Sequence, residues 1–182
     1  MNKNRVERIL SALKEMGLTQ MLITDPMSVC YLTGVQMNPC ERFYGLYLRE
    51  DGKHVYFLNR MFHVPEDTEA EQVWYSDTDP VMDLVAKYVD HEQALGVDRE
   101  LKAGFLLPLM EQGAAKGFVE ASDAVDRTRA VKDAEEQAKM RRSSKINDLA
   151  MGEFRKLIRE GVTEEEVAAQ MLSIYRSLGA ES

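Results

Sequence analysis

Short apolar runs alternate with helix-like segments from Arg5 to Glu120, and this alternation constrains the fold more than any other feature of the chain. The helix-like segments repeat apolar residues every three or four positions, as a helix does when one of its faces is buried. The runs between them are about four to six residues long, which is the usual length of a strand. We therefore expect an α/β fold in which a mixed β-sheet is flanked by helices.

The individual elements of this domain can be placed along the sequence. Helices are expected at 5–16, 27–33, 81–89 and 101–112, and strands at 21–24, 45–49, 54–59, 72–75, 94–97 and 117–120. Asp51 and Gly52 stand between the second and third strands, and this dipeptide suits the positive backbone angles of a tight hairpin turn. Those two strands are expected to pair antiparallel.

The character of the sequence changes near Arg127, where the strand-like runs stop. Residues 131–158 have the pattern of one long charged helix with apolar residues along one side. A second helix is expected to begin at Thr163, because Thr163 and Glu166 have the spacing of a capping box. We therefore divide the chain into a domain of residues 1–127 and a segment of residues 128–182 that forms a C-terminal helical pair.

Composition excludes several classes of function. A net charge of −8 argues against nucleic acid as a partner, because neutralising phosphates requires a surplus of Lys and Arg. The chain begins with a charged amphipathic pattern rather than a signal peptide, and no apolar run is long enough to span a membrane. We expect a globular protein that is cytoplasmic and does not bind a membrane.

No motif for a self-contained active site occurs in the sequence. A Gly-rich phosphate loop, a His-Glu-x-x-His pair and a Gly-x-Ser-x-Gly elbow are all missing. His54, His63 and His91 fall in separate elements, so we expect no metal site within this chain. Cys30 and Cys40 lack the spacing of a zinc or redox motif and are expected to be free thiols.

The segment from Gly34 to Phe43 is the candidate for recognition. Gly, Asn and Pro punctuate it as they do in a loop, and the adjacent acid and base Glu41 and Arg42 follow. Loops held between rigid elements often carry binding residues. An ordinary surface connection with both charged side chains in solvent explains the same composition. The residues alone leave both interpretations open.

Motifs spread along the chain resemble the Xaa-Pro dipeptidases and aminopeptidases of the creatinase, or pita-bread, metallopeptidase superfamily. The run Tyr31-Leu32-Thr33-Gly34 and the later pair Glu41-Arg42 resemble the turn and the charged pair of the creatinase-type N-terminal domain, which is RNase H-like. The run from Arg129 to Glu135 resembles the Arg-x-x-Lys-x-x-Glu junction that opens the catalytic domain of these enzymes. The residues from Gly161 to Glu166 and Gly179-Ala180 are similar to its next helix.

The resemblance implies a reaction that this chain does not carry out alone. Family members cleave the bond preceding proline with a hydroxide bound to two divalent metal ions, such as Mn, Co or Zn, held by an Asp, Asp, His, Glu, Glu set. We expect the chain to end before these ligands, so no catalytic residue and no metal ligand can be carried over. The chain alone is expected to be inactive and to contain no cofactor.

The resemblance also implies a role in assembly. In relatives the N-terminal domain packs against another subunit and helps to close the active-site entrance. We expect a homodimer in which Glu41 and Arg42 contribute charge at that entrance while Asn38 and Pro39 determine its shape. The other expected partners are the catalytic domain and, for the full-length enzyme, proline-containing peptides.

Two other interpretations remain at this point. One is a stand-alone, non-catalytic module of the same fold that serves dimerisation or peptide binding, although its C-terminal helices would then expose apolar stripes that usually need a partner. The other is an unrelated nucleotide-binding α/β domain, which would require the phosphate loop that this sequence lacks.

Overall fold

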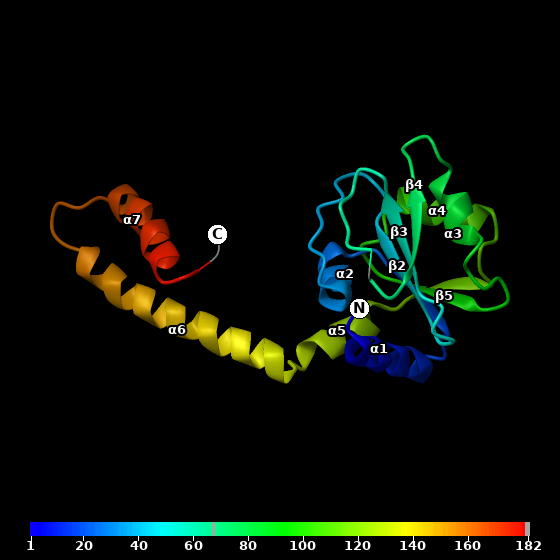
Figure 1. The fold of residues 1–182 in the computed structure, drawn as a ribbon, viewed down its shortest axis with the longest axis horizontal. Coiled ribbons are helices and arrows are strands. Elements are labelled where there is room, and N and C mark those ends of the chain that lie inside the picture. The colour runs from blue at the N-terminus through cyan, green and yellow to red at the C-terminus, as the bar shows by residue number, and fades with distance from the viewer. Residues whose placement is uncertain (67, 181–182) are drawn as a thin grey trace. The chain divides into compact units, whose positions relative to one another are not determined.

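The computed structural model describes residues 1–66 and 68–180, which form two compact units, Met1–Ala130 and Val131–Ser182. The first unit contains a six-stranded mixed sheet flanked by helices, and the second contains a helical pair (Figure 1). The predicted α/β class with a C-terminal helical pair is therefore confirmed. No helix in the described ranges has both the length and the apolar character that crossing a membrane requires.

The sheet has the strand order β4-β3-β2-β1-β5-β6. Its strands are β1 (Gln20–Ile23), β2 (Gly45–Arg49), β3 (Val55–Asn59), β4 (Glu71–Tyr75), β5 (Ala94–Val97) and β6 (Gly117–Glu120). Strand β2 pairs antiparallel with β1 and β3, while the other neighbours in the sheet pair parallel. Five strands thus share one direction and only β2 opposes them. Their carboxyl ends, together with the amino end of β2, lie at one edge of the sheet.

The hairpin between β2 and β3 is confirmed. Gly45 pairs with Phe57 and Tyr47 with Val55 in an antiparallel register. Gly52 has a φ of 81° in the connecting turn, a left-handed conformation that glycine adopts without a steric penalty. The local turn chemistry therefore sets this register.

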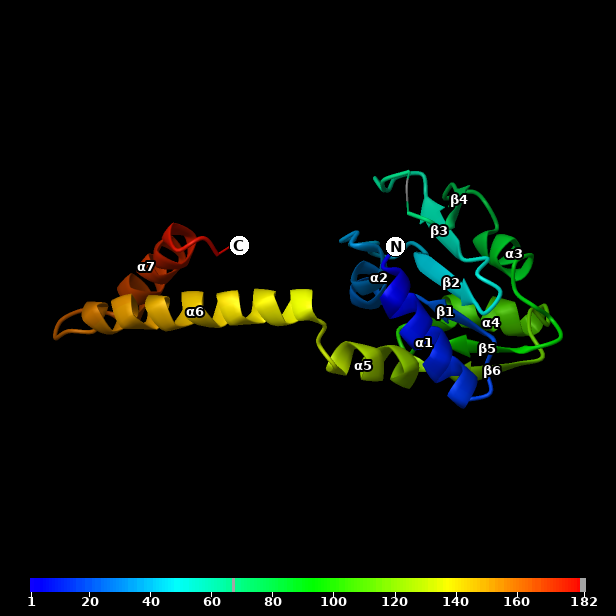
Figure 2. The same cartoon turned by 60° about the horizontal axis from the view of Figure 1, so that its bottom comes forward.

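Five helices of the first unit cover both faces of the sheet (Figure 2). They are α1 (Lys3–Glu15), α2 (Pro26–Thr33), α3 (Val81–Ala86), α4 (Ala103–Glu111) and α5 (Ser122–Ala130). Helices α1, α2 and α5 contribute to one hydrophobic cluster, and α3 and α4 contribute to the other. In α1 the buried residues Val6, Ile9 and Leu13 follow the helical spacing of the sequence. The sheet is therefore the middle layer of three.

Helix α5 is the element that the sequence pattern did not predict. Its buried residues are small: Ala124 and Val125 are 1% and 2% exposed, and Thr128 is 4% exposed. Such residues give a weak hydrophobic signal although they face the core. The helix passes through residue 127, and the first compact unit ends with it at Ala130.

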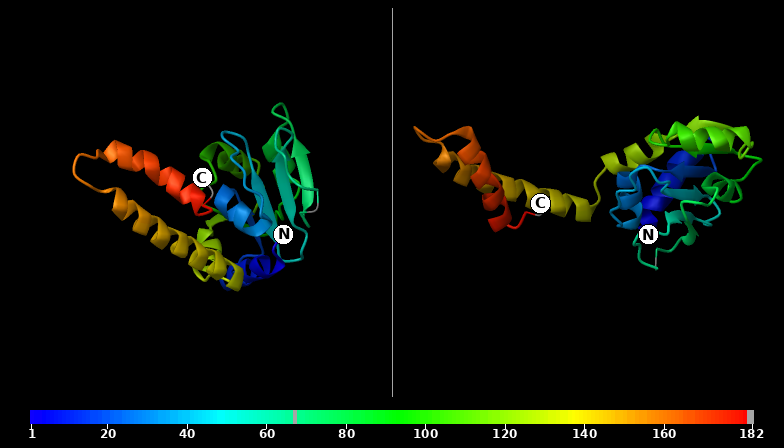
Figure 3. Two further views of the ribbon diagram at one scale, coloured as in Figure 1. Left: turned by 60° about the vertical axis from the view of Figure 1, so that its left-hand side comes forward. Right: turned by 90° about the horizontal axis from the view of Figure 1, so that it is seen from above.

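The second unit consists of α6 (Ala134–Leu157) and α7 (Glu164–Ser177), which returns along α6 (Figure 3). The long helix begins three residues later than its pattern indicated, because Asp133 and Glu136 form a capping box. The predicted capping box of Thr163 and Glu166 is confirmed. Among the described residues of this unit only Ala150 is buried.

Candidate functional site

Polar side chains gather where the strands of the first unit end. Thr24 and Asp25 follow β1, Asp98 follows β5, Asn59 is the last residue of β3, and Asp77 follows β4. The loop that leads into β2 reaches the same edge from the opposite direction. Ligands of α/β proteins usually bind outside the carboxyl ends of the strands. This edge is the candidate functional site.

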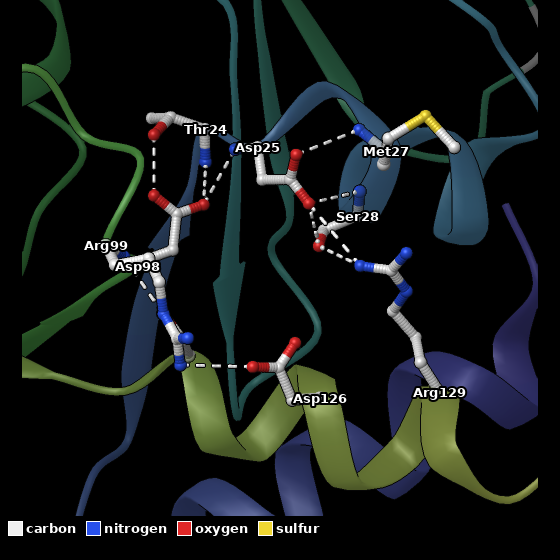
Figure 4. A network of polar contacts seen from close by, with 9 residues as sticks. Thr24, Asp25, Met27, Ser28, Asp98, Arg99, Asp126 and Arg129 are labelled. Carbon is white, nitrogen blue, oxygen red and sulfur yellow. Dashed lines mark hydrogen bonds and ion pairs between the residues drawn. The ribbon is translucent and has the colours of Figure 1, made fainter.

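The carboxylate of Asp98 joins the ends of β1 and β5 (Figure 4). It accepts hydrogen bonds from the Thr24 amide at 2.5 Å, the Thr24 hydroxyl at 2.6 Å and the Asp25 amide at 2.7 Å. Asp98 is only 6% exposed, and this burial raises the pKa of its carboxyl, while the three donors act in the opposite direction. We interpret Asp98 as a structural clamp.

Asp25 begins α2 and also contacts α5 (Figure 4). Its carboxylate accepts from the Ser28 amide at 2.9 Å and from the Met27 amide at 3.2 Å, as a helix N-cap does. The guanidinium of Arg129 lies 3.5 Å from the same carboxylate and 3.2 Å from the Ser28 hydroxyl. Arg129 is the first residue of the junction motif, and in this structure it fastens the end of α5 to the start of α2.

A small pocket of about 160 Å³ lies beside these residues. It is lined by Asp25, Ser28, Asp98, Arg99, Glu100, Ser122, Val125 and Asp126. Arg99 partly balances the acidic lining through an ion pair of 3.1 Å with Asp126. The described residues provide no cluster of three or more His, Cys, Asp or Glu side chains that could hold a metal ion. They therefore do not fit a two-metal centre.

A second pocket, of about 180 Å³, lies between the loop of residues 34–43 and the start of α4. Its lining consists of Thr24, Pro26, Asn38, Pro39, Cys40, Arg42, Phe43, Tyr44, Glu100, Lys102 and Phe105. The Lys102 ammonium donates to the Cys40 carbonyl at 2.6 Å, which attaches the loop to α4. The Asn38 side chain accepts from the Cys40 amide at 3.3 Å and supports the turn. Asn38, Pro39 and Arg42 thus share one pocket wall, whereas Glu41 does not line it.

Arg42 is held by a bidentate ion pair with Asp77. Its Nε lies 2.9 Å from Asp77 Oδ1, and its Nη2 lies 2.8 Å from Asp77 Oδ2. Asn59 donates to the same carboxylate at 2.7 Å, and the hydrogen bonds from Arg42 and Asn59 lower the pKa of Asp77. The Arg42 side chain is 27% exposed, whereas that of Glu41 is 77% exposed. Glu41 and Arg42 are adjacent charged residues in the sequence, but the structure holds Arg42 in a partly buried ion pair and leaves the Glu41 side chain largely exposed.

Sequence reasoning did not identify Asp77, Asp98 or Lys102. Asp77 lies in the polar run Ser76-Asp77-Thr78-Asp79 directly after β4, and Asp98 follows β5. A search for polar residues immediately after strand-like runs could have found both, because strands that share a direction end at one edge. Lys102 gave no such signal, since it precedes a helix.

Comparison with known proteins agrees with this architecture. The family model of the creatinase/prolidase N-terminal domain matches residues 5–131. A putative dipeptidase of Bacillus subtilis, YkvY, is 27% identical over 177 residues, which cover 92% of this chain and 48% of the relative. The chain spans about half the length of the curated relatives that it matches.

Solved structures share the fold. A Xaa-Pro dipeptidase from Bacillus anthracis has a TM-score of 0.79 at 23% identity, covering 98% of this chain and 50% of that one. The creatinase/prolidase N-terminal domain of an X-Pro dipeptidase from Streptococcus pyogenes has a TM-score of 0.57 at 20% identity, covering 69% of this chain and 98% of that one. The sheet, the helices on both of its faces and the family match lead to one conclusion: this chain belongs to the creatinase/prolidase N-terminal domain family.

Proposed function

We propose that this chain is the N-terminal accessory domain of a cytoplasmic Xaa-Pro dipeptidase or aminopeptidase, followed by the first helices of the catalytic domain. One observation carries the proposal: both units, and not the first alone, fall within the 98% of the chain that matches half of a Xaa-Pro dipeptidase. The two divalent metal ions, Mn, Co or Zn, would be held by residues outside this chain, where they would supply the nucleophilic hydroxide. The division at residues 127 and 128 belongs to the same proposal.

The contribution of this chain to substrate binding would come from the loop that carries Arg42. Its contacts with Asp77 and Glu41 engage one N–H of each guanidinium nitrogen. An arginine side chain has about five such donors, so each terminal nitrogen keeps one for another acceptor. A peptide carboxylate is a matching acceptor, because guanidinium and carboxylate groups form strong charge-assisted hydrogen bonds.

The proposed assembly is a homodimer in which this loop borders the substrate channel of the other subunit. Asn38 and Pro39 would set the shape of the entrance, since they form the pocket wall beside Arg42. Glu41 would add negative charge at the rim, because its side chain is exposed. Asp77 and Asn59 would fix the direction of the Arg42 guanidinium.

Hydrolysis of a Xaa-Pro dipeptide with added manganese tests the proposal. The purified chain should show no turnover, whereas a longer protein that carries this chain followed by a catalytic domain should cleave the dipeptide. In the longer protein, Arg42→Ala should raise KM about tenfold or more and change kcat little, because it removes a charge-assisted contact of about 1.5–3 kcal/mol. Lys53→Gln, which removes a positive charge from an 81% exposed side chain in the β2–β3 turn, is the matched control. Cleavage by this chain alone would contradict the assignment, and an unchanged KM would remove Arg42 from the entrance.

The alternative is a stand-alone module for dimerisation or peptide binding. It is favoured by the first unit, Met1–Ala130, which is compact and has a hydrophobic cluster on each face of its sheet, so it has a core of its own. Titration calorimetry of this chain with a proline-containing dipeptide distinguishes the two functions. Binding by the isolated chain, without any requirement for a catalytic domain, would support the module.

A further inference from the structure

The turn of residues 38–42 carries Arg42, and two charged side chains from distant parts of the first unit hold it. Asp77, which follows β4, binds the Arg42 guanidinium. Lys102, at the start of α4, donates from its Nζ to the Cys40 carbonyl at 2.6 Å. The first contact fixes the side chain of Arg42, and the second fixes a peptide group two residues before it. The guanidinium and the backbone of the turn are therefore attached separately.

The Cys40 backbone needs such an attachment because its conformation is unfavourable. Its φ is 54°, in the left-handed region that residues with a Cβ rarely adopt. This conformation costs about 1–2 kcal/mol and persists only where the surroundings stabilise it. Within the turn, the Cys40 amide donates to the Asn38 side chain at 3.3 Å and the Arg42 amide donates to the Pro39 carbonyl at 3.0 Å. Lys102 adds a contact from outside the turn and ties its strained part to another element.

Lys102 occupies a position at which its own helix does not favour lysine. It is the N-cap of α4, and its side chain makes no capping hydrogen bond. Ser, Thr, Asn and Asp are preferred as N-caps because their side-chain oxygens accept from the first amides, and a cation is unfavourable at the positive end of a helix. Residues that break such a local rule are expected mainly at functional sites. The contact with Cys40 supplies a reason for lysine that the helix itself does not.

Helix α4 can anchor the turn because it is packed on the core. Leu109 is fully buried, and the ring of Phe105 contacts that of Phe43 edge-on with the centroids 5.2 Å apart. Phe43 is itself buried and comes directly after the turn. A core contact therefore joins the start of α4 to the end of the loop. The backbone of Lys102 is held in place relative to the turn before its side chain makes any contact.

We propose that Lys102 is a positioning residue, which holds the Cys40 carbonyl and thereby sets the direction in which Arg42 leaves the turn. The effect on substrate acts through Arg42 and rests on the proposed function, whereas the hold on the turn does not. Residue 102 is exposed, and contacts of exposed charged groups contribute modestly to stability. The expected effects are therefore changes of a few fold rather than complete losses.

The test is the exchange of the Arg42 Nε–H with water, followed by NMR in the full 182-residue chain. Lys102→Ser removes the ammonium but supplies a better N-cap. This exchange should become about threefold faster, while the urea midpoint from tryptophan fluorescence should not fall. Lys102→Arg can still donate to the carbonyl and should keep the exchange near its natural rate. Lys116→Ser is the control, because Lys116 is exposed and precedes β6 at the opposite edge of the sheet.

Three results in this chain would overturn the proposal. They are an unchanged Nε–H exchange in Lys102→Ser, equally fast exchange in Lys102→Arg, and a lower urea midpoint in Lys102→Ser, which would assign Lys102 to the stability of α4 instead.

The Xaa-Pro assay of the longer protein tests the effect on substrate. Lys102→Ser should raise KM about threefold with little change in kcat, and Lys102→Arg should keep KM near its natural value. An unchanged KM in Lys102→Ser, in a protein whose KM rises with Arg42→Ala, would overturn the positioning role. If neither variant changes KM, the entrance role of the loop fails and the effect of Lys102 on substrate fails with it. The exchange measurement then still decides whether Lys102 holds the turn.

Discussion

The polar contacts inside the two units of the chain differ in how far apart in sequence their residues lie. In the first unit, polar side chains join residues that are distant in sequence: Asp98 accepts from Thr24, and Arg42 binds Asp77, 35 residues away. In the second unit most polar contacts join residues within one turn of a helix, such as Lys139 with Glu135. Long-range contacts fix a loop against a sheet and can preform a binding site, whereas local contacts stabilise only the helix that contains them.

The two units also differ in how much apolar surface they bury. The first unit has a hydrophobic cluster on each face of its sheet, and the second unit buries only Ala150 among its described residues. Leu149 and Leu172 are each 50% exposed. A helical pair that buries so little apolar surface gains little from the hydrophobic effect, so most of the chain's own stability should reside in the first unit.

Among the changes that test this difference between the units, Asp98→Ala is expected to lower the free energy of unfolding of the first unit the most. The substitution removes three hydrogen bonds and leaves the Thr24 and Asp25 amides without their acceptor. Asp98 is only 6% exposed, so these amides lie in a buried position. Each unsatisfied buried donor costs about 1–3 kcal/mol, so the free energy of unfolding should fall by about 3 kcal/mol. Urea unfolding can be followed by the fluorescence of Trp74, the single tryptophan, which reports on the first unit.

Asp126→Ala is the matched control for this measurement. Asp126 lines the same pocket, but its side chain is 50% exposed and its ion pair with Arg99 lies at the surface. Pairs of that kind contribute under about 1 kcal/mol. Similar losses for the two variants would mean that Asp98 is no clamp and that long-range polar contacts do not distinguish the first unit.

The fold was largely predictable because its elements carry strong local patterns. The buried residues of α1 follow the helical period, and Asp51-Gly52 indicates the turn of the β2–β3 hairpin. Helix α5 was missed since its core residues Ala124, Val125 and Thr128 are too small to produce a periodic signal. Its place is set by tertiary packing against α1, which no local pattern contains.

The candidate site was less predictable than the fold. The family resemblance selected Asn38, Pro39, Glu41 and Arg42, but it gave none of the contacts that hold them. Asp77 reaches Arg42 only because β4 and the amino end of β2 lie at the same edge of the sheet. Such a contact depends on strand order, and strand order is a property of the whole sheet rather than of any segment.

A pair of glycine substitutions sharpens the comparison between the units. A Cβ at Gly96 in β5 would lie 3.1 Å from the Ala121 Cβ and 3.2 Å from the Gln20 carbonyl, so Gly96→Ala should destabilise the first unit by about 1–3 kcal/mol. At Gly152 in α6, no atom beyond the neighbouring backbone of its own helix lies within 4 Å of such a Cβ, and Gly152→Ala should stabilise the helix by about 0.5–1 kcal/mol. Trp74 fluorescence reports the first change, and hydrogen exchange of the α6 amides reports the second. Destabilisation by Gly152→Ala would show that α6 is packed more closely than its exposure indicates.

The smallest expected effect is the pH dependence contributed by Asp77. Its pKa is lowered in the folded state by the hydrogen bonds from Arg42 and Asn59, so the folded protein binds the proton less readily than the unfolded chain does. The resulting stability is present above the unfolded pKa of about 3.9 and is lost as the pH falls through the lower, folded pKa. Asp77→Asn should therefore be less stable than the natural chain at neutral pH, and the difference should close under acid.

Urea midpoints from Trp74 fluorescence between neutral and acid pH measure this difference, and salt should reduce it because the pair is partly exposed. Glu41→Gln is the control: Glu41 contacts the same guanidinium, but its side chain is 77% exposed, so it should alter the pH profile less. If the two variants behave alike, Asp77 holds Arg42 no more firmly than a solvated neighbour does. The loop would then lack a fixed guanidinium, and the first unit would differ from the second in burial but not in the preformed geometry that a binding site requires.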